Sequence, residues 1–256
     1  MRFFYVSKLK FSTEKQRCRL EKRCRQRKSC KKVGMILAKK KLMTNAEYPV
    51  QYTVIKNLMG DMDIECDIYV SESNRYDAFA DKNGIKFTTA VIEDYIEQPY
   101  VLRFFAAHEL VHIKYKEYGF LQALKSTWAS YSSAFGIKGP LRKGNAQILL
   151  SEMRANLEGA SYAKLTPIEL IMSQDAVQER NNDSVRPKSY NVGYPDREMI
   201  KEYAHRYQQL TETVAYDILL EYCTQLKIRN HEQFIKKAIS KFFNKPRLWK
   251  LWIGGK

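Results

Sequence analysis

The sequence lacks any long run of apolar residues. No stretch of its 256 residues approaches the roughly 18–20 uninterrupted apolar residues that a membrane-spanning helix needs. The apolar run at the start is also too short for the hydrophobic part of a secretory signal. The chain therefore predicts a soluble, cytoplasmic protein without a transmembrane segment. At 45% hydrophobic and 12% aromatic residues, the composition is globular and allows a sizeable core.

Cysteine is scarce, and its arrangement argues against two kinds of site. The five cysteines are an odd number, and Cys18, Cys24 and Cys30 follow one another at a spacing that matches no C-x-x-C zinc motif. We therefore expect neither a disulfide framework nor a cysteine–zinc site. Free thiols fit a reducing compartment.

Acidic residues are nearly absent from the first 45 residues. This segment contains 16 Lys and Arg but only Glu14 and Glu21, so it holds +14 of the formal charge of +16. A basic arm of this kind can bind nucleic acid or an anionic membrane surface through its charge. The alternatives are a solvated, partly disordered tail and an extension of a protein that begins at Met35.

Changes in composition predict three parts, which are a basic arm at 1–45, a core at 46–170, and a polar loop with a helical region at 171–256. The loop is expected at 173–192, because Asn, Asp and Pro steps interrupt the helical pattern there. From Asp196 onward the pattern is helical and ends in a tail rich in Lys and Trp.

A β-hairpin is predicted within the core. The segment Cys66–Ser71 alternates in the manner of a strand. Further on, Lys82-Asn83-Gly84 separates two short β-rich runs, and Asn-Gly is the strongest short-range signal for a hairpin with a type I′ turn. We therefore expect the second strand of the hairpin at about Ile85–Thr89.

Two long helices should follow the hairpin. The first begins at Pro99, which suits a first helical turn, and runs without a breaker to Gly119 as the residue that ends it. The second opens with Asn145 as its N-cap and stops before Thr166-Pro167.

The first helix carries the motif H-E-L-V-H. On a helix, His108 and His112 project from the same face, so both imidazoles can meet one zinc ion. Glu109 points slightly round the helix, where it can take a proton from water at the metal, as in zinc hydrolases with H-E-x-x-H. The alternative is a packed amphipathic helix that happens to contain two histidines.

A catalytic zinc ion usually has a third protein ligand. We expect Glu152, midway along the second helix, with Asn156 one turn on as the group that hydrogen-bonds the far nitrogen of a ligand histidine. Other candidates for the third ligand are Glu158, His205 and His231.

These residues resemble a group of zinc peptidases. H-E-x-x-H followed on a later helix by E-M-R-A-N is similar to the gluzincin pattern. The stretch N-R-Y-D-A-F-A-D-K-N-G-I-K-F-T-T resembles a run in the CAAX-prenyl-protease and heat-shock-membrane-protease family, and the similarity spans roughly residues 66–163. A second resemblance is to the soluble ImmA/IrrE type, whose members cleave or inactivate transcriptional repressors.

The resemblance implies an α+β fold, in which a small mixed sheet packs on a metal-binding helix pair as in zincins and a mostly helical C-terminal part follows. It also implies that the second hairpin strand is an edge to which a substrate peptide is added, through Ile85, Lys86, Phe87, Thr88 and Thr89. The sequence departs from the first family in having no membrane helix, and in having Asn156 where an Asp often stands.

The implied function is that of a zinc-dependent metalloendopeptidase with its catalytic core at 46–170. His108, His112 and Glu152 would hold Zn²⁺, and Glu109 would act as general base while water attacks a peptide carbonyl of the protein or peptide substrate. Candidates for stabilising the oxyanion of the transition state are Tyr194, Arg197 and His205.

The competing class is a non-enzymatic binding module. In this reading the metal site is degenerate or structural, and the basic arm at 1–45 binds nucleic acid or an anionic membrane surface. Glu109→Gln separates the two classes, because it abolishes a catalytic function only. Removal of the arm abolishes the binding function.

Overall fold

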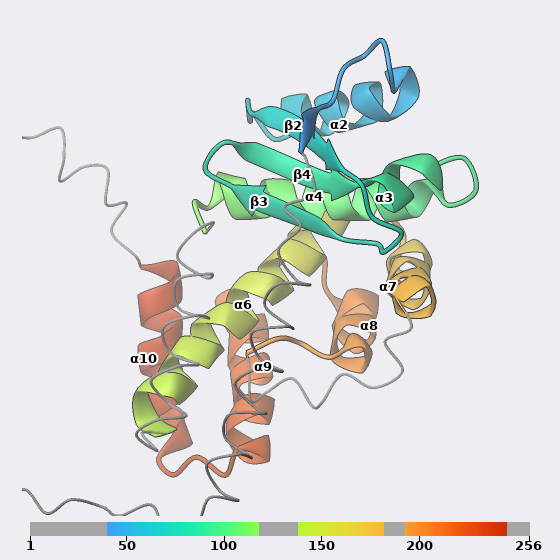
Figure 1. The fold of residues 1–256 in the computed structure, drawn as a ribbon. Coiled ribbons are helices and arrows are strands. Elements are labelled where there is room, and N and C mark those ends of the chain that lie inside the picture. Colours follow the sequence, from blue (N-terminus) through green and yellow to red (C-terminus); the bar gives the residue numbers. More distant parts are fainter. Residues whose placement is uncertain (1–39, 118–137, 182–192, 245–256) are drawn as a thin grey trace, which may run out of the picture. The chain divides into compact units, whose positions relative to one another are not determined.

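The computed structural model describes residues 40–117, 138–181 and 193–244, to which the following description refers (Figure 1). The arm as far as Lys39, the second half of the expected polar loop, Gly119 and the C-terminal tail lie outside these residues. The described part contains eight helices and one four-stranded sheet, so the α+β class is confirmed. None of the described helices is both long and apolar enough to span a membrane.

The sheet is small and mixed, as predicted. Its strands are β1 (Lys41–Leu42), β2 (Asp67–Ser71), β3 (Ala78–Asp81) and β4 (Gly84–Thr88), in the spatial order β1-β2-β4-β3. β2 and β4 run parallel, whereas β1 is antiparallel to β2 and β3 is antiparallel to β4. β1 lies in the segment expected to be an arm, so this end of the segment belongs to the sheet.

The predicted hairpin is present as β3 and β4, but its turn is of a different type. A type I′ turn needs positive φ at both central residues, and neither Lys82 nor Asn83 is among the described residues with positive φ. Gly84 has φ 149°, and a Cβ atom there would lie 2.0 Å from the carbonyl oxygen of Asp67 in β2. The glycine is therefore needed for the parallel pairing with β2 as well as for the turn.

The prediction that Ile85–Thr89 is an edge strand is wrong. β4 pairs with β2 on one side and β3 on the other, so its backbone groups are used in the sheet. Thr89 already belongs to the next helix. Among the described residues, β1 and β3 each have a partner on one side only, and β3 therefore provides the free edge next to β4.

The helices are α2 (Pro49–Asp61), α3 (Thr89–Glu93), α4 (Pro99–Lys114), α6 (Lys138–Tyr162), α7 (Pro167–Asn181), α8 (Arg197–Arg206), α9 (Glu212–Gln225) and α10 (His231–Phe243). α4 begins at Pro99 and α6 stops before Thr166-Pro167, as predicted. α6 starts earlier than Asn145, because Pro140 falls in the first turn of the helix, where no backbone N–H is needed.

α4 ends five residues before Gly119. Its last residue is Lys114, and Lys116 takes the left-handed conformation with φ 54° that we expected of a glycine. The N–H of Lys116 donates to the carbonyl of Ile113, and the N–H of Glu117 donates to the carbonyl of His112. These two bonds form a Schellman motif, which turns the chain back so that Glu117 lies beneath the last turn of α4.

The expected loop at 173–192 is partly helix, because α7 continues to Asn181. α7 opens with a capping box, in which Thr166 and Glu169 each accept a hydrogen bond from the backbone N–H of the other. Its C-terminal residue Asn181 binds the backbone N–H and carbonyl of Tyr76 beside the sheet. These contacts stabilise a segment whose polar composition alone predicts a loop.

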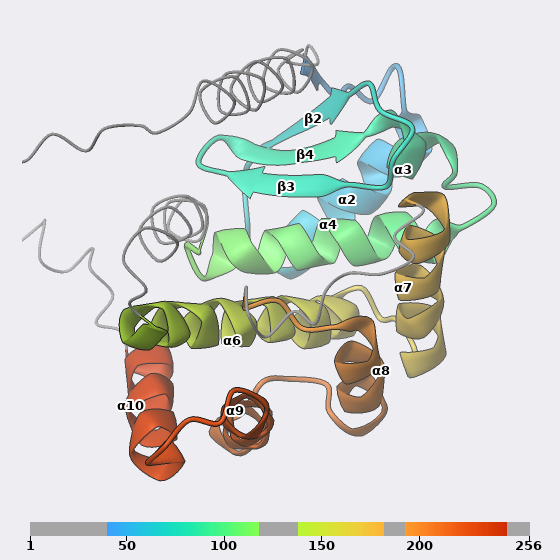
Figure 2. The same ribbon diagram turned by 60° about the horizontal axis from the view of Figure 1, so that its bottom comes forward.

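Two hydrophobic clusters lie on opposite sides of α4 and α6. One lies between the sheet, α2 and α4, and the other lies between α6, α8, α9 and α10. Figure 2 shows this order, with the sheet above α4, α4 above α6, and α9 and α10 below. The contact between α4 and α6 therefore lies between the two clusters, and the H-E-L-V-H motif of α4 is part of this contact.

Candidate metal centre

Small residues allow α4 and α6 to approach closely. Ala107 of α4 and Ala155 of α6 are fully buried, and Gly159 of α6 lies against the backbone of Ala107 and His108. This approach brings the inward face of α4 within reach of side chains from the middle of α6.

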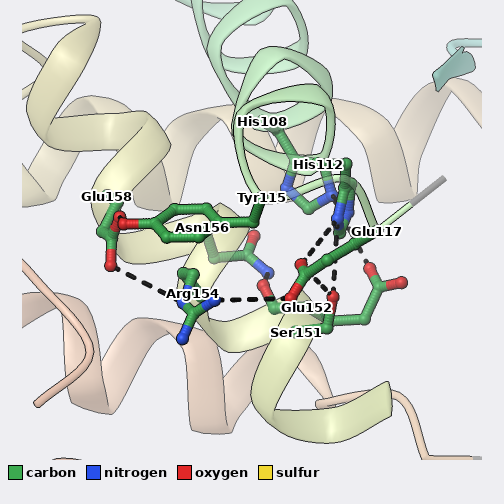
Figure 3. A network of polar contacts seen from close by, with 9 residues as sticks. All are labelled: His108, His112, Tyr115, Glu117, Ser151, Glu152, Arg154, Asn156 and Glu158. Carbon is green, nitrogen blue, oxygen red and sulfur yellow. Dashed lines mark hydrogen bonds and ion pairs between the residues drawn. The ribbon is translucent and has the colours of Figure 1, made fainter. Parts of the chain in front are cut away.

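Three side chains meet at this contact. His108 Nε2 lies 3.2 Å from His112 Nε2 and 3.6 Å from a carboxylate oxygen of Glu152. The ligand atoms of all three residues lie within 4.8 Å of one another. Figure 3 shows the two imidazoles projecting from α4 towards the carboxylate on α6. The predicted trio is therefore brought together, and its position is internal, since both His112 and Glu152 are buried.

The spacing of these atoms fits a metal ion. Two ligand atoms at about 2.0–2.1 Å from a tetrahedral ion are about 3.3–3.5 Å apart, and the measured separations of 3.2 and 3.6 Å lie close to this range. Two imidazole nitrogens facing each other at 3.2 Å need either a shared proton or a cation between them. The residues present can therefore hold a metal ion with little movement.

Negative charge surrounds the two histidines. Glu109, Glu117 and Glu152 are all at most 9% exposed, and buried carboxylates need a compensating positive charge. Burial by itself would lower the pKa of His112, but the hydrogen bond to Glu117 and the charges of Glu152 and Glu109 outweigh it and raise this pKa to about 9. The site thus attracts a cation.

The other third-ligand candidates lie elsewhere. Glu158 accepts a hydrogen bond from the Tyr115 hydroxyl at 2.8 Å and lies 3.8 Å from Arg154, so it takes part in a different set of contacts. His205 and His231 are exposed, at the end of α8 and the start of α10.

Asn156 forms no hydrogen bond with either histidine among the described residues. Its amide donates to the carbonyl of Glu152 at 2.7 Å, and its amide oxygen accepts from Gln174 at 3.4 Å. Gln174 in turn accepts hydrogen bonds from Arg197. Asn156 therefore belongs to a chain of polar contacts that runs from α8 to the backbone of Glu152, and the expectation that it orients a histidine is not supported.

The carboxylate beside the far nitrogen of a histidine is that of Glu117, which the sequence did not indicate. Its Oε2 atom lies 3.4 Å from His112 Nδ1 and accepts a hydrogen bond from the Ser151 hydroxyl. Its Oε1 atom accepts from Arg154 at 3.4 Å. Burial by itself would raise the pKa of Glu117, but the bonds from His112 and Ser151 and the charge of Arg154 lower it.

Two aromatic rings pack against Arg154. Its guanidinium carbon lies 4.1 Å from the centre of the Tyr115 ring and 4.0 Å from that of Phe242 in α10. Cation–π contacts of this kind restrict a guanidinium and compensate part of its lost hydration. α10 thus contributes to the surroundings of the candidate metal centre through Arg154.

The proposed oxyanion donors lie on or just before α8. Arg197 donates to both oxygens of Gln174, as described above. Tyr194 is half-buried and follows Gly193, whose backbone packs against Asn145, two turns before Glu152 in α6. These contacts bring the start of α8 against α6 and α7 without assigning a catalytic role to any of the three candidates.

Comparison of the chain with family models, with curated proteins and with solved structures finds no match. The function is therefore inferred from the chemistry of the site.

Proposed function

We propose that this protein is a zinc-dependent metalloendopeptidase. The observation that carries the proposal is the meeting of two imidazole nitrogens, from His108 and His112, with the carboxylate of Glu152. Two histidines and one glutamate are the protein ligands of catalytic zinc in several metallopeptidases, and they leave one position of a tetrahedral ion open. Mixed nitrogen and oxygen ligands also suit zinc better than magnesium or calcium, which prefer oxygen alone.

The packing around the site supports the same proposal. A helix that carries both histidines lies between a small mixed sheet and a second helix that carries the third ligand, which is the arrangement expected of a zincin-like core (Figure 2). The ligands come from regular helices, whose packing holds side chains more precisely than loops do.

Glu109 is the residue that we assign to proton transfer. When bound, zinc would polarise a substrate carbonyl and make water more acidic. Glu109 follows the first ligand, is 9% exposed, and its charge acts on His112. A carboxylate in this position takes the proton of the attacking water and returns it to the leaving amine.

The free edge of β3 is where we propose that a substrate peptide binds. β3 packs near α4, as Figure 2 shows. The N–H of Thr88 donates to the carbonyl of Asp77, which fixes the alternation of the antiparallel ladder. It follows that the backbone groups of Ala80 point away from β4. An extended peptide can pair with such groups as an additional strand.

Hydrolysis of unfolded proteins tests the proposal. Purified full-length protein is incubated with a denatured protein mixture, and new N-termini are identified by mass spectrometry. We expect internal cleavage that a chelator abolishes and added zinc restores. Cleavage that continues after complete removal of metal would contradict the proposal, as would the absence of any cleavage by protein loaded with zinc.

A further inference from the structure

We infer that Glu117 is a positioning residue for the metal centre, which fixes His112 with its Nε2 lone pair facing the metal position. The inference rests on the proposed function, and it adds a residue outside the H-E-x-x-H motif and outside α6. It follows from the donors and acceptors around His112 Nδ1, shown in Figure 3.

Two groups face His112 Nδ1, and both act as acceptors. Glu117 Oε2 lies at 3.4 Å and Ser151 Oγ at 3.5 Å. The single hydroxyl proton of Ser151 is donated to Glu117, so Ser151 has only its lone pairs to offer the imidazole. Because neither neighbour donates, Nδ1 carries the proton when the imidazole is neutral, as it is when it binds a metal. The Nε2 atom then keeps its lone pair, which is the form that binds a metal.

Glu117 itself is held on both oxygens. Ser151 donates to Oε2 and Arg154 donates to Oε1 at 3.4 Å. The backbone of Glu117 is fixed by its hydrogen bond to the carbonyl of His112, at the end of α4. The carboxylate therefore cannot turn away from the imidazole without giving up contacts to α6. A ligand histidine whose far nitrogen is held by a carboxylate keeps its ring orientation and is a stronger base.

Unlike His112, His108 has no carboxylate in the described part of the chain that holds its far ring nitrogen. Its Nδ1 atom is buried and has no hydrogen-bond partner among the described residues. The ring of His108 is instead packed against Phe104, with their centres 5.6 Å apart. Glu117 thus serves one of the two histidines, so its substitution should change the metal site without removing a ligand.

Glu158 provides a matched control. It lies 3.8 Å from Arg154 on α6, and like Glu117 it is a partner of that guanidinium. Its carboxylate also accepts a hydrogen bond from the Tyr115 hydroxyl, where Glu117 instead faces a histidine. Glu117→Gln and Glu158→Gln therefore each remove one carboxylate charge beside Arg154. Only the first removes the carboxylate from His112.

The experiment measures zinc affinity by competition with a chromophoric chelator, on full-length wild type and both variants. We expect Glu117→Gln to bind zinc about 10–100-fold more weakly, the usual effect of losing such a partner, while Glu158→Gln stays close to wild type. The visible absorption of bound Co²⁺ gives a second readout, because it reports coordination geometry and does not respond to a merely structural change. We expect this spectrum to change in Glu117→Gln only.

Ser151→Ala covers the case in which Glu117→Gln does not fold. It removes one hydroxyl that holds Glu117, and we expect a loss of roughly 2–10-fold in zinc affinity, the effect of one hydrogen bond. Wild-type affinity and an unchanged Co²⁺ spectrum in Glu117→Gln, or unchanged affinity in Ser151→Ala, would overturn the role of Glu117 and leave the proposed function standing. A wild-type protein that binds no zinc would overturn both.

Discussion

Gly159 of α6 lies so close to His108 of α4 that a Cβ atom on the glycine would be 3.0 Å from the His108 backbone nitrogen and 3.1 Å from its Cα atom. Both neighbouring atoms belong to the backbone of a helix, so neither can move aside on its own. The distance between the two ligand-bearing helices is therefore limited by this one residue.

Gly159→Ala should destabilise the protein by about 1–3 kcal/mol, because the added methyl forces α4 and α6 apart. Urea unfolding of the zinc-free protein measures this. Gly144→Ala is the control, since it lies in the same helix with nothing within 4 Å of the added atom. Helix propensity predicts that Gly144→Ala is neutral or stabilising by up to about 1 kcal/mol. Equal effects of the two changes would contradict the close approach.

Glu109→Gln should keep zinc but lose peptide hydrolysis. The amide has nearly the shape of the carboxylate but cannot accept a proton, so the rate should fall by about 10²–10⁴-fold. Cleavage of a peptide that the wild type hydrolyses measures the rate, and zinc content is determined on the same sample. A variant that keeps both zinc and full activity would exclude Glu109 as the general base.

Ala80→Pro should weaken substrate binding without affecting the metal. The N–H of Ala80 points to the free edge of β3, so its loss removes one hydrogen bond to a peptide, and KM should rise by roughly 2–10-fold. Phe79→Pro is the comparison, because the N–H of Phe79 faces β4 and its loss should destabilise the sheet. An unchanged KM in a folded Ala80→Pro variant would argue against peptide addition at this edge.

Thr166→Ala should destabilise the protein by about 0.5–2 kcal/mol, since it removes half of the capping box of α7.

The hydrogen bond from the backbone N–H of Thr166 is the largest of the effects that lower the pKa of Glu169. A carboxylate with a lowered pKa stabilises the fold at neutral pH, and this contribution is lost as the pH falls through that pKa. Thermal unfolding across acidic pH should show this loss in the wild type, and Glu169→Gln should lack it. The same pH dependence in both proteins would contradict the assignment.

The sequence predicts which side chains meet between α4 and α6 better than it predicts the surroundings of these side chains. His108, His112 and Glu152 are found because helical periodicity fixes which face each occupies, and the two helices are long enough to be recognised. Glu117 is missed because Lys116, and not a glycine or asparagine, takes the left-handed conformation in the turn after α4. Its position depends on that turn, and the turn is stabilised by tertiary contacts.

In the fold, likewise, features set by neighbouring residues are predicted, whereas features set by contacts between distant segments are not. The β3–β4 hairpin is predicted because its signal lies within a few residues. The pairing of β4 with β2 joins strands that β3 separates in the sequence, and nothing in the local pattern of Ile85–Thr89 indicates it. Likewise, α7 is polar in sequence but is held by Asn181 at the sheet.

Elemental analysis of metal content is the decisive test of the proposed zinc site. It is determined on purified full-length wild type, His112→Ala and Glu152→Ala, with Glu158→Ala as the control at the rival carboxylate. We expect about one zinc per chain in the wild type and in Glu158→Ala, and strong loss in the other two variants. Absence of zinc from the wild type after reconstitution, or retention of zinc in Glu152→Ala, would exclude the proposed site.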